Sequence, residues 1–206
     1  MTKLNRVIIH TMGYLILGLG IMLIIKTKIG SFPYDATVYY LMKIINVKEI
    51  DFGITSIITG GIITIINFIL IRKKEVFFSF LLILVFGFVL SFWGWFLPDS
   101  IYQGTFHLDF LIALLGITIV SIALAIIIQN KRFPTSPPEM SLIYLIGKTK
   151  NPFISKLIIE LTFILIALIM AFILNDFSQI TWFSLVTIPL SSVLIHIFNK
   201  FIIKIN

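Results

Sequence analysis

Long stretches without a charged side chain alternate with short polar clusters along the chain. As helices, the uncharged stretches would each be roughly 28–34 Å long, enough to cross the hydrocarbon core of a bilayer. They are Val7–Ile25, Phe52–Ile71, Val76–Pro98, Phe110–Asn130 and Phe177–Asn199. A sixth apolar stretch, Phe153–Leu174, contains Lys156 and Glu160. The pattern predicts six transmembrane helices.

Two shorter apolar segments do not fit this length. Residues 33–46 would form roughly 21 Å of helix and residues 137–147 roughly 16 Å. Each begins at a proline, a favourable first helical residue, and each follows a break rich in Gly, Ser, Thr or Pro. We expect both to be short re-entrant half-helices.

The two halves of the chain resemble each other at a constant offset of about 104 residues. The offset superposes Pro33 on Pro137, Asp35 on Glu139 and Tyr40 on Tyr144. We therefore expect a first membrane repeat at residues 1–104 and a second at 105–206, within a single membrane domain. Three spans per repeat would invert the second repeat relative to the first, as is common in transporters.

The distribution of basic residues favours six spans over eight. If the short segments turn back, 11 of the 16 Lys and Arg lie inside and Lys156 lies within a span. The remaining four, Lys26, Lys28, Lys43 and Lys48, then lie outside. If both segments cross, the inside and outside totals are nearly equal. The positive-inside rule thus predicts cytoplasmic N- and C-termini in a bacterial plasma membrane.

Composition agrees with a membrane protein and excludes several classes. Residues are 59% hydrophobic and 12% charged, and the mean hydropathy is +1.10. The net charge is +7, and the basic residues lie in short clusters between the apolar stretches. This pattern indicates loops that face an anionic membrane surface and does not indicate nucleic-acid binding. The chain has no cysteine, no P-loop, no H-E-x-x-H and no G-x-S-x-G. We expect no catalytic residues, metal or cofactor, and hence no enzyme.

The two helix breaks carry the first candidate site residues, which are Ser31, Asp35, Ser136 and Glu139. Ser136 and Glu139 have the spacing of a capping box, and a carboxylate in a first helical turn is favoured by the helix dipole. The functional alternative is that both breaks line a central cavity. Their N–H groups would then hold an anionic group and the carboxylates a cation or proton.

Glu160 is the second candidate, because a carboxylate within a membrane span is costly and commonly functional. Lys156 lies one turn earlier. An ion pair between the two is the structural alternative, although a Lys-to-Glu order at this spacing contributes only a few tenths of a kcal/mol. Both interpretations stay open from the sequence.

The chain resembles the YczE/YyaS/YitT-type bacterial membrane proteins. The resemblance rests on Gly18–Lys26 and on Gly30–Asp35, where Phe32 and Tyr34 depart from the family pattern. In the second half Pro138 stands where the family often has a basic residue. Lys156 and Glu160 resemble a family Arg/Glu pair. The resemblance implies a multi-pass membrane protein suspected of transport, without a settled substrate.

The leading functional hypothesis is a small-solute transporter or permease with a central site at the paired helix breaks. Its partners would be the lipid bilayer, an unknown small solute and a proton or cation, with homo-oligomerisation left open. Two alternatives remain. The chain could be a substrate-binding subunit of an ATPase-driven transporter, or a structural or regulatory membrane protein that does not transport.

Overall fold

The computed structural model describes residues 3–102, 104–129 and 135–201, which are helical and contain no strand. Six long helices have the length and composition of membrane spans. They are α1 (Lys3–Thr27), α3 (Phe52–Ile71), α4 (Glu75–Phe96), α5 (Phe106–Gln129), α7 (Pro152–Leu174) and α8 (Trp182–Phe201). Two short helices, α2 (Pro33–Ile45) and α6 (Pro137–Thr149), have 13 residues each. The 3-10 helix η1 (Asp99–Ile101) precedes α5. The predicted all-α polytopic membrane fold is confirmed.

The long helices expose apolar side chains and bury polar ones, the reverse of a soluble protein. Phe88 of α4 and Phe172 of α7 are 68% and 71% exposed, whereas Thr59 and Asn67 of α3 and Ser79 of α4 are buried. Lipid tails would solvate the exposed rings. The hydroxyls of Thr59 and Ser79 donate to backbone oxygens of their own helices, and Asn67 bonds to α6. The side-chain distribution therefore agrees with helices that cross a bilayer.

The chain divides into two compact units that interleave along the sequence. Unit 1 comprises residues 1–32, 92–133 and 178–206, and so contains α1, α5 and α8. Unit 2 comprises residues 33–91 and 134–177, and so contains α2, α3, most of α4, α6 and α7. Each unit takes helices from both predicted sequence repeats.

Within unit 1, α1 and α5 approach closely at two glycines. A Cβ on Gly20 would lie 2.8 Å from the carbonyl oxygen of Gly116, and one on Gly116 would lie 2.9 Å from the oxygen of Gly20. Small residues allow such backbone contacts between membrane helices. Trp93, near the end of α4, also donates its indole N–H to the carbonyl oxygen of Leu15 on α1 at 2.9 Å.

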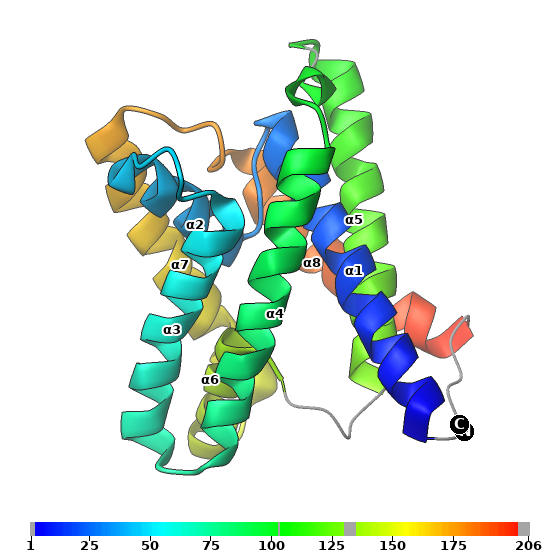
Figure 1. The fold of residues 1–206 in the computed structure, drawn as a ribbon, viewed down its shortest axis with the longest axis vertical. Helices are drawn as coiled ribbons and strands as arrows, with labels where there is room; N and C mark the ends of the chain where they lie inside the picture. Colours follow the sequence, from blue (N-terminus) through cyan, green and yellow to red (C-terminus); the bar gives the residue numbers. More distant parts are fainter. Residues whose placement is uncertain (1–2, 103, 130–134, 202–206) are drawn as a thin grey trace. The chain divides into compact units, whose positions relative to one another are not determined.

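Within unit 2, α3 and α4 are joined by a short turn and meet at Gly53 and Gly87. A Cβ on Gly53 would lie only 2.1 Å from the carbonyl oxygen of Gly87. The short helices α2 and α6 both pack against α3 and α7. Figure 1 shows α2 beside the upper end of α3 and α6 beside its lower end.

Two ion pairs and one shared cavity are as expected if α2 and α6 turn back without crossing the membrane. Lys43, near the end of α2, pairs with Asp176, just after α7. Lys26 at the end of α1 pairs with Asp99 at 2.7 Å. Lys148 at the end of α6 lines the same cavity as Lys73 in the α3–α4 turn. Eight crossings would put the members of each pair on opposite faces of the membrane, whereas six crossings put them on the same face.

Candidate functional site

Asp35 lies in the first turn of α2, with only 7% of its surface exposed. Pro33 begins the helix, and Asp35 follows where the helix dipole favours a carboxylate. Ala36 and Val38, which follow Asp35 in the first two turns of α2, are also buried. The N-terminus of α2 thus points a carboxyl group into the packed interior of unit 2.

Glu160 of α7 interacts electrostatically with Asp35. Glu160 in turn interacts with Lys156, one turn earlier on α7. Both Glu160 and Lys156 are partly exposed. Two carboxyl groups and one ammonium group thus influence one another electrostatically where α2 packs on α7. We refer to Asp35, Lys156 and Glu160 as the carboxylate site.

Three further polar residues that the sequence did not single out lie beside this site. The Tyr34 hydroxyl donates to the backbone oxygen of Ser56 on α3 at 3.4 Å. Ser56 is 1% exposed, and its hydroxyl has no hydrogen-bond partner among the residues that the structure describes. The Thr37 hydroxyl donates to the backbone oxygen of Phe163 on α7 at 3.1 Å. These contacts fix α2 between α3 and α7 and leave the Ser56 hydroxyl available.

Glu139 and Ser136 form the predicted capping box at the start of α6. The backbone N–H of Ser136 donates to the Glu139 carboxylate at 3.0 Å. Among the described residues, no interaction joins Glu139 to Asp35, so the structure does not bring the two break carboxylates together by direct contact.

Asn67 holds the first turn of α6 against α3. Its amide N–H donates to the Pro137 oxygen at 2.8 Å, and its carbonyl oxygen accepts from the Ser141 hydroxyl at 2.7 Å. Both amide atoms are therefore used in helix packing. This agrees with the structural role that buried amides commonly have in membrane proteins.

Ser31 belongs to unit 1, where the break after α1 docks against the segment before α8. The Ser31 backbone N–H donates to the Gln179 oxygen at 3.1 Å, and the Gln179 side chain donates to the Ile25 oxygen at 2.8 Å. Gly30 has φ +123°, and a Cβ there would lie 2.6 Å from the Thr181 hydroxyl. The fully buried Ser31 hydroxyl has no hydrogen-bond partner among the described residues.

The additional site residues carry a weak sequence signal. Thr37 and Ser141 each lie one turn after the proline that starts a short helix, at the same 104-residue offset. Each hydroxyl lies within hydrogen-bond distance of its own proline's oxygen, at 3.0 Å and 3.3 Å. The part of the chain that the structure describes contains no group of three His, Cys, Asp or Glu residues arranged as metal ligands.

Comparisons with known proteins agree with the resemblance in the sequence. Residues 4–200 match a family of unknown function (DUF6198). The chain is also 25% identical over 189 residues to the uncharacterized protein YyaS of Bacillus subtilis (strain 168). That similarity covers 92% of this chain and 90% of YyaS. No solved structure matches.

Proposed function

The chain belongs to the DUF6198 family, and on that premise we propose that it is a small-solute permease whose central polar site is the carboxylate site of Asp35, Lys156 and Glu160. The observation that carries the proposal is the Asp35 carboxyl group, which is buried where α2 packs on the membrane-spanning helix α7 and lies within the electrostatic influence of Glu160. Ionisable groups in such a position are costly and are commonly retained for transport or proton relay.

The charge arrangement favours a proton or cation as the coupled species. Two carboxylates in a poorly solvated site repel each other, and a proton or cation between them relieves the repulsion. Lys156 supplies one positive charge from the Glu160 side. A solute that exchanges with the proton or cation would therefore alternate with it at this position. The unpaired Ser56 hydroxyl offers a hydrogen bond to the solute.

The two short helices support a transporter architecture. Their prolines begin α2 and α6 at the 104-residue offset, and their first turns contact α3 at Ser56 and Asn67. These two contacts lie about 16 Å apart along α3. Re-entrant helices that approach from opposite faces are typical of inverted-repeat transporters. We accordingly propose two inverted three-span repeats.

The proposed setting is a bacterial plasma membrane with both chain termini in the cytoplasm. The similar protein YyaS comes from a bacterium. The basic clusters at Arg72–Lys74 and at Lys148 and Lys150 are typical of cytoplasmic loops. This orientation would place the end of α2 with Lys43 at the outer face.

Flux into proteoliposomes tests the proposal. The purified chain is reconstituted, and uptake of a broad panel of small solutes is measured with and without an imposed proton or sodium gradient. We expect gradient-dependent uptake of at least one solute class. Specific binding without flux, together with a stable ATPase complex on purification, would instead favour a substrate-binding subunit. Neither binding nor flux across the panel would contradict both assignments.

A further inference from the structure

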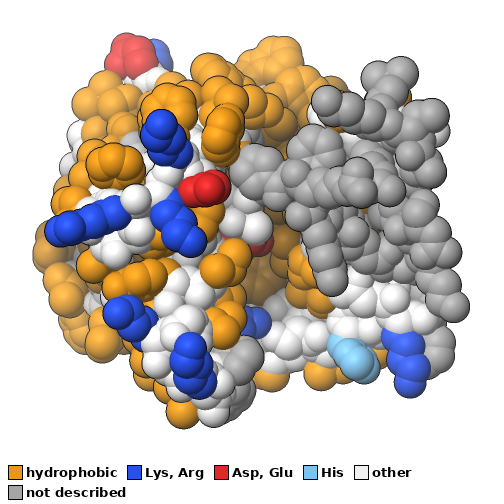
Figure 2. All heavy atoms as spheres, turned by 90° about the horizontal axis from the view of Figure 1, so that it is seen from below, with side chains coloured by type: hydrophobic (Ala, Val, Ile, Leu, Met, Phe, Trp, Pro, Cys, Tyr) orange, Lys and Arg blue, Asp and Glu red, His pale blue; other side chains and the backbone are white. Residues whose placement is uncertain are grey.

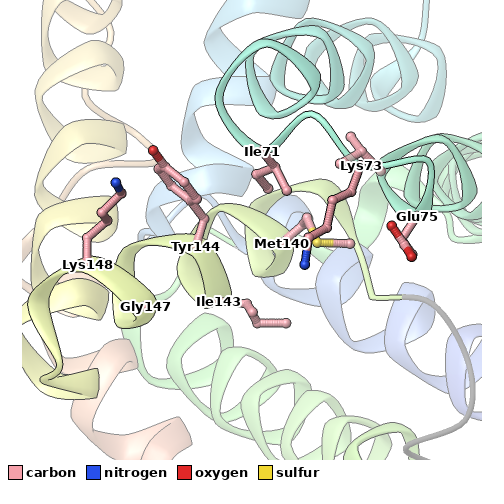
Figure 3. Close-up of a pocket in the computed structure, with 9 residues that line it drawn as sticks. Ile71, Lys73, Glu75, Met140, Ile143, Tyr144, Gly147 and Lys148 are labelled. Atoms are coloured by element: carbon pink, nitrogen blue, oxygen red, sulfur yellow. The ribbon is translucent and has the colours of Figure 1, made fainter.

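A groove of about 620 Å³ opens in unit 2 between the α3–α4 turn and α6. Its floor is apolar, with Ile71, Met140 and Ile143, and its ends are polar. Figure 3 shows Tyr144 and Lys148 at one end and Lys73 and Glu75 at the other. The turn between two membrane-spanning helices lies at a membrane face, so the groove lies at the level of lipid headgroups.

A lysine lies at each end of the groove, and the Glu75 carboxylate lies at the same end as Lys73. Lys73 and Lys148 are both exposed, and neither forms an ion pair among the residues that the structure describes. Lys148 lies over the Tyr144 ring at 5.7 Å, which keeps the ammonium group beside the groove. Figure 2 shows several further Lys and Arg side chains on the face seen from below.

We propose that this groove is a binding site for an anionic phospholipid, with the phosphate between Lys73 and Lys148 and the upper acyl chain over Ile71 and Ile143. A phosphate group matches two separated ammonium groups, and basic pockets between membrane helices bind anionic headgroups. The apolar floor matches an acyl chain and not a free phosphate. The volume suits a small ligand of lipid-headgroup size. This site is separate from the proposed permease site.

Glu75 allows a test in which a substitution raises the affinity for an anionic lipid as well as one in which a substitution lowers it. Its carboxylate lines the same groove and repels an anionic headgroup there. Removal of this charge therefore strengthens binding, whereas removal of either lysine weakens it. A gain in affinity cannot result from misfolding, so Glu75→Gln separates a lipid site from general damage to the protein.

The test is lipid binding to the full-length chain in detergent, measured by native mass spectrometry. Phosphatidylglycerol is titrated against phosphatidylcholine with the same acyl chains. We expect Lys73→Gln and Lys148→Gln each to weaken phosphatidylglycerol binding about fivefold. Glu75→Gln should strengthen it by a similar factor. Lys74→Gln is the matched control, because Lys74 is adjacent and exposed but does not line the groove.

Three results would overturn the proposal. Equal losses in Lys74→Gln and Lys73→Gln would indicate only a diffuse surface charge. Displacement of phosphatidylglycerol by an equal concentration of glycerol 3-phosphate would show that the acyl chain adds nothing, and the site would then be one for a soluble phosphate ester. No preference for phosphatidylglycerol over phosphatidylcholine would remove the charge argument.

Discussion

The carboxyl group of Asp35 is buried between helices that cross the membrane, where an aspartate costs about 2.5–3.5 kcal/mol at a helix centre. The position of Asp35 in the first turn of α2 offsets only part of this free-energy cost, because the favourable interaction with the helix dipole contributes about 0.3–1 kcal/mol. The repulsion from Glu160 adds to the cost. A capping role alone therefore does not offset the cost of a carboxyl group at this position.

Glu160→Gln should abolish gradient-driven flux while leaving the amount of folded protein unchanged. The amide keeps the size of the side chain but cannot release or accept a proton, so the coupled exchange with Asp35 fails. Glu49→Gln, at an exposed position between α2 and α3, is the control and should retain flux. Full activity of Glu160→Gln, measured in proteoliposomes with equal protein content, would remove Glu160 from the mechanism.

Acid should weaken unit 1 through Asp99. Its hydrogen bond from Lys26, at 2.7 Å, lowers the pKa of the Asp99 carboxyl group. Because the pKa is lower in the folded protein, the pair contributes fully to stability at pH values above the pKa of an aspartate in the unfolded chain, about 3.9. The contribution is lost as the pH falls through the folded-state value.

When the pH is lowered from about 5 to about 2, the thermal unfolding temperature of the natural chain should therefore fall. The fall should be smaller for Asp99→Asn, which has no carboxyl group to protonate at this position. The expected difference is small because the Asp99 side chain is exposed. Unfolding in detergent, followed by tryptophan fluorescence, measures it. Identical pH profiles for the two proteins would show that the ion pair contributes nothing measurable.

At the scale of helices, the sequence predicted where each helix lies along the chain better than which helices pack against each other. Five charge-free stretches and one apolar stretch with two charges located the six spans to within a few residues. The prolines located the starts of α2 and α6. The α1 helix begins earlier than the apolar pattern, at Lys3, and α8 begins later, at Trp182. Charged first residues do not stop a helix outside the lipid, and residues 175–181 form the connection before α8.

The contacts between helices could not be predicted in the same way. Thr37 bonds to Phe163 across 126 residues of sequence, and periodicity carries no information about such pairs. The offset between the repeats suggested Asp35 with Glu139, and that offset offered no reason to place Asp35 within the electrostatic influence of Glu160. Equivalent positions in two repeats are related by symmetry, which does not require them to touch.

Gly53→Ala should destabilise the α3–α4 pair. The added methyl group would lie 2.1 Å from the Gly87 backbone oxygen, and a backbone atom cannot move aside as a flexible side chain can. Overpacking of this kind costs about 1–3 kcal/mol. Gly147→Ala is the control, because a Cβ there meets nothing within 4 Å. Thermal unfolding in detergent should show a loss for the first variant only, and equal stability would contradict the close contact.

For the whole molecule, the six-span path predicts which loops share a face of the membrane. The natural chain has no cysteine, so single cysteines report without background. Lys74→Cys and Lys150→Cys should both be protected from a membrane-impermeant maleimide in intact cells, while Lys48→Cys should be labelled. Eight spans would instead place Lys74 and Lys150 on opposite faces. Labelling of only one of these two positions in intact cells would therefore refute the re-entrant helices.

The interleaving of the two units sets an order for biosynthesis. The α1 helix emerges from the ribosome long before its packing partner α5, and α2 and α3 emerge long before α6 and α7. At about 5–20 residues per second, the delay is about 5–20 s for a separation near 100 residues. The early helices must therefore wait in the bilayer with their polar surfaces unmatched. A quality-control protease that samples nascent membrane proteins has its opportunity during this interval.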